Sequence, residues 1–174
     1  ENTSGLQNGA VGYEAFQNNT SGLSNTAVGF RAGKDITTGD SNTAVGQSAL
    51  ENTGTGDSNT AVGQRALDAN SDGSDNTSLG KMSLFKNTRG VKNTSVGVES
   101  LYSNERGVVA IQDGKNVYGN YGAYNTAVGY QSAYYGTTAN YNTAVGFKSL
   151  YNTDGHSNTA IGASAGLGIR SGSK

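Results

Sequence analysis

The sequence is organised by a pentapeptide, Asn-Thr-Ala-Val-Gly, that recurs along almost the whole chain. It occurs unchanged at residues 25–29, 42–46, 59–63, 125–129 and 142–146, and looser copies begin at Asn8, Asn76, Asn93 and Asn158. From Asn8 to Asn93 the leading asparagines are 17 residues apart each time. A fixed period of this length is typical of a solenoid, in which each repeat forms one coil.

The repeat favours short strands. Counted from the leading asparagine as position 1, position 3 is alanine or serine, position 4 is valine, leucine or isoleucine, and position 5 is glycine. These segments are too short and too rich in glycine for helices. We predict that Thr-Ala-Val forms one strand, that the stretch ending in Ala49-Leu50 forms a second, and that Gly46 allows the bend between them.

The composition alone would suggest disorder, because only 33% of the residues are hydrophobic and 27 of the 174 are glycine. The strict period argues against disorder, and the absence of proline suits a backbone whose N–H groups are needed in a hydrogen-bond ladder. We therefore predict an all-β protein: one repeat domain over residues 1–174, a parallel β-roll or β-solenoid of about ten 17-residue coils.

Parallel stacking of the coils would place equivalent residues ~4.8 Å apart and turn each repeat position into a column. The leading asparagines would then bond to one another through their side-chain amides, and the valines would form an apolar ladder. The predicted ladder residues are Asn25, Asn42, Asn59, Asn76, Asn93, Asn125 and Asn142, together with Val28, Val45, Val62, Val128 and Val145.

The predicted core of one chain is thin. Its inward set would be one valine, one alanine and one leucine per coil, which buries little apolar surface compared with the entropy of ordering 17 residues. We therefore predict that the chain associates with copies of itself, as a homotrimer or a similar assembly, so that the apolar ladder is buried against a second surface.

The period breaks once, between Asn93 and Asn125, which are 32 residues apart. We interpret 102–124 as an irregular coil, in which Val108-Val109-Ala110-Ile111-Gln112 replaces the usual pentapeptide.

Eight of the ten tyrosines lie within residues 118–151. Exposed tyrosines are favoured in recognition surfaces, but tyrosines in register would also stack as a ladder between coils. Both interpretations stay open, and the register of Tyr124 with Tyr141 favours stacking. The candidate receptor-binding residues are Tyr118, Tyr121, Tyr124, Tyr134, Tyr135 and Tyr141.

The unit Ser-Asn-Thr-Ala-Val-Gly-x-x-Ala-Leu resembles the YadA-type head repeats of trimeric autotransporter adhesins, whose Asn-Ser-Val-Ala-Ile-Gly motif is close to residues 158–162. Similar repeats occur in phage-like tail-fibre proteins. The resemblance spans residues 2–166, although the coils of this chain are longer than those of the adhesin heads. It implies a left-handed β-roll of three chains packed side by side. It also implies a non-enzymatic fibre on a cell or virion surface that attaches to a glycan or protein receptor.

Other functional classes find little support. The chain has no cysteine and a net charge of −1, so a thiolate metal site and an electrostatic footprint for nucleic acid or membrane are not expected. His156 is the only histidine, and Asp72 and Asp75 share a turn but lack the glycine-rich calcium nonapeptide. We expect no catalytic residue, metal or cofactor.

Two alternatives to attachment remain, a structural spacer without a ligand and an ice-binding solenoid. Thr26, Thr43, Thr60, Thr77 and Thr94 form one column, but with alanine next to it this column would lack the paired ranks of an ice-binding face. Because the first residues, Glu1–Gly5, resemble the interior connection at 51–54, we also expect the chain to be a piece of a longer fibrous protein.

Overall fold

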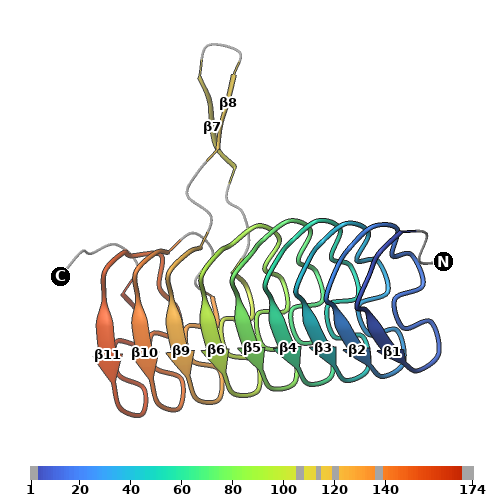
Figure 1. The fold of residues 1–174 in the computed structure, drawn as a ribbon. Coiled ribbons are helices and arrows are strands. Elements are labelled where there is room, and N and C mark those ends of the chain that lie inside the picture. Colours follow the sequence, from blue (N-terminus) through green and yellow to red (C-terminus); the bar gives the residue numbers. More distant parts are fainter. Residues whose placement is uncertain (1–3, 105–107, 113–114, 119–121, 136–138, 170–174) are drawn as a thin grey trace.

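The computed structural model of the chain describes residues 4–104, 108–112, 115–118, 122–135 and 139–169, and it shows a β-solenoid of about eight turns (Figure 1). Each coil contributes one short strand to a single nine-stranded parallel sheet. The strands are β1 (Gly9–Val11), β2 (Thr26–Val28), β3 (Thr43–Val45), β4 (Thr60–Val62), β5 (Thr77–Leu79), β6 (Thr94–Val96), β9 (Thr126–Val128), β10 (Thr143–Val145) and β11 (Thr159–Ile161). The predicted all-β, parallel solenoid is confirmed.

Neighbouring strands pair without any offset. In β3 and β4, for example, Thr43 lies opposite Thr60, and Ala44 lies opposite Ala61. The sequence period therefore becomes a set of straight columns of equivalent residues.

The part of the chain that the structure describes contains no helix with the length and apolarity that crossing a bilayer requires.

The second strand of each coil is not formed, so that prediction is wrong. Residues 47–50 are turn residues, and Ser48 and Leu50 have left-handed backbones with φ of 56° and 51°. The N–H of Ser48 donates to the carbonyl of Phe30 in the preceding coil at 2.8 Å, whereas the N–H of Leu50 donates to Ala66 in the next coil at 3.1 Å. Left-handed residues at alternate positions curl the chain, and the bonds to both neighbouring coils hold this strained conformation in place.

The core consists mainly of the alanines that most strands carry at position 3 and of the large residue that most coils carry at position 9. The strand alanines Ala27, Ala44, Ala61, Ala127 and Ala144 are fully buried, as are Leu50, Leu67, Leu84 and Leu150. Successive residues of a strand point to opposite faces, so the threonine and the valine beside each inward alanine must point outward. The predicted inward set is therefore wrong for valine: Val28 and Val128 are 40% and 37% exposed.

A buried amide column supports the coil on another side. The Oδ1 of Asn42 accepts two hydrogen bonds from Asn59, one from the backbone N–H of Asn59 at 2.9 Å and one from the Nδ2 of Asn59 at 3.1 Å. The Nδ2 of Asn59 also donates to the carbonyl of Gly73 at 2.9 Å. The contact with the backbone N–H repeats in every described coil from Asn25 to Asn158. Buried amides are thus supplied with partners, as their desolvation requires.

In the coils of β5 and β6, where serine replaces alanine in the core, its hydroxyl is hydrogen-bonded to another buried serine. The Oγ of Ser78 donates to the Oγ of Ser83 at 2.8 Å, which in turn donates to the Oγ of Ser95 at 2.9 Å. Ser95 continues the chain to Ser100 in its own coil. These hydroxyls lie where other coils, such as those of β3 and β4, have alanine, and their mutual bonds make their burial tolerable.

Residues 108–112 do not form an extra coil, and that interpretation is wrong. They form β7 (Val108–Gln112), which pairs antiparallel with β8 (Lys115–Tyr118) in a hairpin that Figure 1 shows outside the row of coils. Beneath it β6 pairs directly with β9. The Nδ2 of Asn87 donates to the carbonyl of Gly90, three residues on, whereas Asn104 makes the same contact with Gly122, eighteen residues on. The hairpin is therefore an insertion into one outer connection of the solenoid.

Candidate interaction surface

The outward face of the sheet carries two regular columns. The residues at position 2 are threonines in every strand except β1, and those at position 4 are valine, leucine or isoleucine throughout. Their side chains are exposed or half-buried along the whole solenoid. We call this surface, positions 2 and 4 of the nine strands, the Thr/Val face.

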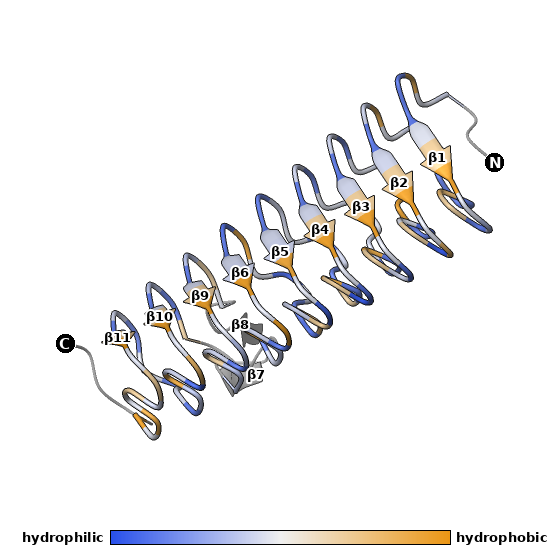
Figure 2. Ribbon diagram, turned by 90° about the horizontal axis from the view of Figure 1, so that it is seen from below, coloured by the Kyte–Doolittle hydropathy of each residue, from blue (hydrophilic) through white to orange (hydrophobic). Residues whose placement is uncertain are grey.

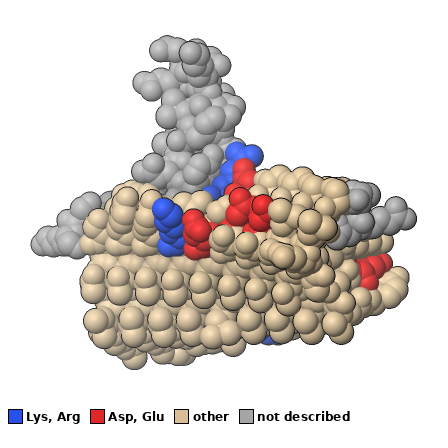
Figure 3. Space-filling model, viewed as in Figure 1, with Lys and Arg blue, Asp and Glu red and all other residues tan. Residues whose placement is uncertain are grey.

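The Thr/Val face has no charged residue, because none occurs at either position. Figure 2 shows the apolar ends of the strands as one row along the solenoid. In Figure 3 most of the charged side chains in view lie on the upper part of the rod, above the tan rows of side chains, and a further acidic group lies at its right-hand end. A long, regular, uncharged and partly apolar surface of this kind is typical of a contact region.

Two pairs of stacked rings border the Thr/Val face at β9 and β10. Tyr124 and Tyr141, which directly precede the asparagines of these coils, stack with ring centroids 4.9 Å apart. On the other side of the same strands Tyr130 and Phe147 stack at 5.6 Å. The corresponding positions in β3 and β4 are serine and glutamine, so the aromatic borders are confined to part of the rod.

A longer aromatic column lies at position 10 of four successive coils. Phe85 stacks on Tyr102 at 5.1 Å, Tyr102 on Tyr134 at 4.8 Å, and Tyr134 on Tyr151 at 5.3 Å. The Tyr102–Tyr134 contact joins the two coils between which the hairpin is inserted. Tyr135 meets Tyr134 and Tyr151 edge-on. Burial raises the pKa of Tyr134 to about 12, and the carboxylate of Glu99 adds to this shift.

The six candidate receptor-binding tyrosines do not form one cluster. Tyr124 and Tyr141 stack as a pair, whereas Tyr134 and Tyr135 belong to the position-10 column. These stacks occupy ring faces that a sugar ring would otherwise use. For Tyr118 the structure describes only the backbone, in β8, and Tyr121 lies outside the described residues.

The sequence analysis did not predict that the rings of Phe85, Tyr102, Tyr130 and Phe147 stack between coils. The signal was present, because Phe85 and Tyr102 share position 10 with Tyr134 and Tyr151, and Tyr130 shares position 6 with Phe147.

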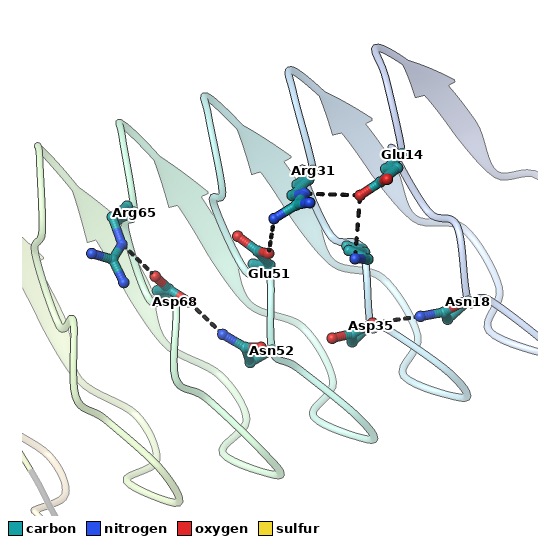
Figure 4. Close-up of polar contacts among 9 residues, drawn as sticks. Glu14, Asn18, Arg31, Asp35, Glu51, Asn52, Arg65 and Asp68 are labelled. Carbon is teal, nitrogen blue, oxygen red and sulfur yellow. Dashed lines mark hydrogen bonds and ion pairs between the residues drawn. The ribbon is translucent and has the colours of Figure 1, made fainter.

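Charged side chains near the N-terminal coils pair across the coils (Figure 4). Arg31 lies 2.8 Å from Glu14 and 3.7 Å from Glu51, and Lys34 lies 3.2 Å from Glu14. Burial tends to raise the pKa of Glu14, but the hydrogen bonds from Lys34 and Arg31 outweigh this effect and the pKa is lowered. Opposite charges thus occupy adjacent levels of the rod, where like charges would destabilise it.

The remaining candidate chemical groups are engaged in contacts between coils. The Nδ1 of His156 accepts the backbone N–H of Asn140 at 3.1 Å. Asp72 pairs with Arg89 at 3.1 Å and accepts a hydrogen bond from Ser71. Within the described ranges, no three histidine, aspartate or glutamate side chains form a group that could hold a metal ion.

A hollow of about 550 Å³ lies beside β1, the first strand of the part that the structure describes. It is lined by core residues such as Phe16 and by Asn19, whose buried amide has no hydrogen-bond partner among the described residues. The acidic residue Glu14 in its lining is held by Arg31 and Lys34. The hollow therefore has the character of an uncovered core layer.

The sequence matches no family model, no curated protein and no solved structure.

Proposed function

We propose that the chain is a non-enzymatic segment of an extracellular attachment fibre, in which copies of the solenoid pack together through their Thr/Val faces. The fibre would be an adhesin head or stalk, or a tail fibre, that binds a glycan or protein receptor. The observation that carries the proposal is the apolar column at position 4, which runs along the nine described strands and stays exposed or half-buried in the single chain.

The energetics of a single coil favour this assembly. A typical coil buries the small residue of its strand and one large side chain, such as Ala44 and Leu50, whereas the aliphatic residue of the strand remains partly exposed. Full burial of a valine contributes about 1.5–3 kcal/mol, so covering the exposed part of each contributes roughly 1 kcal/mol per coil. Because the columns are straight, one partner surface can cover all nine strands at once.

The number of copies, three, and the surface location rest on the resemblance to trimeric adhesin heads. The geometry leaves the hairpin, inserted in an outer connection, available to a target while the Thr/Val face is covered.

The side chains considered for chemistry, His156 and Asp72, hold neighbouring coils together. The net charge of −1 offers no attraction for nucleic acid.

Charges placed on the Thr/Val face are expected to dissociate the assembly. In the variant Val28→Lys/Val62→Lys, two lysines two coils apart would have to be buried without partners, which is strongly unfavourable. We expect this variant to sediment as a folded monomer, while its circular dichroism stays that of the original chain.

The matched control is Ser21→Lys/Thr55→Lys, which adds the same charge, also two coils apart, at exposed positions of the outer connections. It should keep the mass of the unmodified assembly in the same sedimentation experiment. If both variants retain that mass, the Thr/Val face is not the contact between copies.

Ice binding is a second candidate, and one observation favours it. Because alanine points inward, each outward threonine has an outward valine, leucine or isoleucine two residues on, so the face carries a second rank beside the threonines. The inward alanine therefore does not interrupt this face, although its second rank is aliphatic and is not a second threonine column. Thermal hysteresis of the solution tests this candidate: an assembly that covers the Thr/Val face should show none, and a clear hysteresis gap that Val28→Lys/Val62→Lys removes would favour ice binding.

A further inference from the structure

Tyr124 and Tyr141 form the most accessible pair of stacked tyrosines among the described residues. Their ring centroids lie 4.9 Å apart with an interplanar angle of 11°. Their exposed fractions are 45% and 60%. Both residues have left-handed backbones, with φ of 57° and 58°, and the N–H of Tyr141 donates to the carbonyl of Ala123 at 3.1 Å. The backbone therefore holds two phenols side by side on adjacent coils.

We propose that this pair is a site of oxidative modification, at which Tyr124 and Tyr141 couple into a dityrosine that links two coils of one chain. The oxidant is a peroxidase with hydrogen peroxide. Each phenol loses one electron and one proton to give a phenoxyl radical. The two radicals join through a new carbon–carbon bond between ring positions ortho to the hydroxyls, and the rings return to phenols by proton shifts. The peroxide is reduced to two waters, and the protein loses two hydrogen atoms.

The other stacked rings are less suited to this reaction. Tyr130 stacks on Phe147 and Tyr13 stacks on Phe30, so each of these pairs has only one phenol and cannot couple within itself. Tyr102, Tyr134 and Tyr151 are half-buried. The raised pKa of Tyr134 also disfavours loss of its proton.

Tyr135 is exposed but meets its neighbours edge-on, with interplanar angles of 80° and 86°. In such a T-shaped contact the edge of one ring faces the flat of the other, whereas coupling requires two ring edges to meet. Tyr124 and Tyr141 are nearly parallel, and a small sliding motion of two exposed side chains brings their edges together.

A bond at this site would fasten the coils of β9 and β10, which follow the hairpin insertion. The two tyrosines are 17 residues apart, so the link closes a short loop and restricts the unfolded chain. This link lies within one chain, and its formation does not require the assembly of copies proposed above.

The test treats the full chain with a peroxidase and limiting hydrogen peroxide. We expect an intact mass lower by two hydrogen atoms, a chain of monomeric size on a denaturing gel, and a linked pair of chymotryptic peptides that contain Tyr124 and Tyr141. Tyr141→Phe should abolish the link and keep the ring stack, whereas Tyr151→Phe should leave the link unchanged.

Three results would overturn the proposal: no loss of hydrogen under these conditions, links that join mainly other tyrosines, or covalent dimers and trimers in place of a chain of monomeric size. Circular dichroism of Tyr141→Phe verifies that the variant is folded, so the loss of its crosslink reports the missing phenol.

Discussion

Replacing Gly46 by alanine should lower the free energy of unfolding by about 3–5 kcal/mol, since backbone strain and overpacking each contribute about 1–3 kcal/mol. Gly46 has a φ of +128°, a conformation that residues with a side chain rarely adopt. A Cβ at this position would also lie 2.7 Å from the carbonyl oxygen of Gly63 in the next coil. That oxygen belongs to the backbone and cannot move without disturbing the stack. Urea unfolding at a fixed chain concentration measures the change.

Gly54→Ala is the matched control, because Gly54 has no left-handed φ and its nearest contact for a Cβ is the Ser71 carbonyl at 3.4 Å. We expect it to change stability by less than about 0.5 kcal/mol or to stabilise the chain slightly. Equal effects of the two substitutions would mean that the bend after the strand is not fixed by close backbone stacking.

The substitution Asn59→Leu should destabilise the solenoid by about 2–5 kcal/mol, because a buried polar group left without a partner costs about 1–3 kcal/mol and overpacking adds a similar amount. Leucine has the branched shape of asparagine, but its two methyl groups are bulkier than the amide and must fit a fully buried site. The backbone N–H of Asn76 loses its acceptor and is left without a partner. The carbonyl of Gly73, the Oδ1 of Asn42 and the Nδ2 of Asn76 each lose one bond and keep another. These groups are buried, and the loss extends to both neighbouring coils.

Asn52→Leu provides the comparison, since the exposed Asn52 makes a single side-chain bond, to Asp68 at 2.6 Å. Its effect should stay below about 1 kcal/mol. Both variants are followed by urea unfolding. An Asn59→Leu protein as stable as Asn52→Leu would show that the amide column is not needed for stability.

The period of the sequence predicted the solenoid because every coil repeats the same contacts. Once the spacing of Asn42 and Asn59 is read as one coil, parallel in-register pairing follows directly. The direction of the strand side chains could not be obtained in the same way. A three-residue strand, Thr-Ala-Val, offers two outward positions and one inward position, and the close approach of the coils favours the small alanine inside.

The second strand failed as a prediction because Ser48 and Leu50 take left-handed backbones that their residue types do not signal. Ladder bonds to both neighbouring coils impose that conformation, and such tertiary effects are not visible in local sequence. The buried positions themselves were predictable, since the leucines of position 9 are both periodic and apolar.

The hairpin was misread as a coil although the sequence contains a signal for it. The dipeptide Asp-Gly at 113–114 follows the apolar run 108–111 and is followed two residues later by Val117-Tyr118, a pattern that favours a tight hairpin turn. The 32-residue gap after Asn93 suggested a missing coil, and that interpretation obscured the local pattern. The stacking of Tyr124 on Tyr141, by contrast, follows from their register alone.

The molar mass of the unmodified chain in solution, measured by light scattering, tests the central claim most directly. The proposed assembly predicts a particle of three 17.8 kDa chains, held together through the Thr/Val face. A stable, folded particle with the mass of a single chain would contradict the account, because the Thr/Val face would then be exposed to water along its whole length.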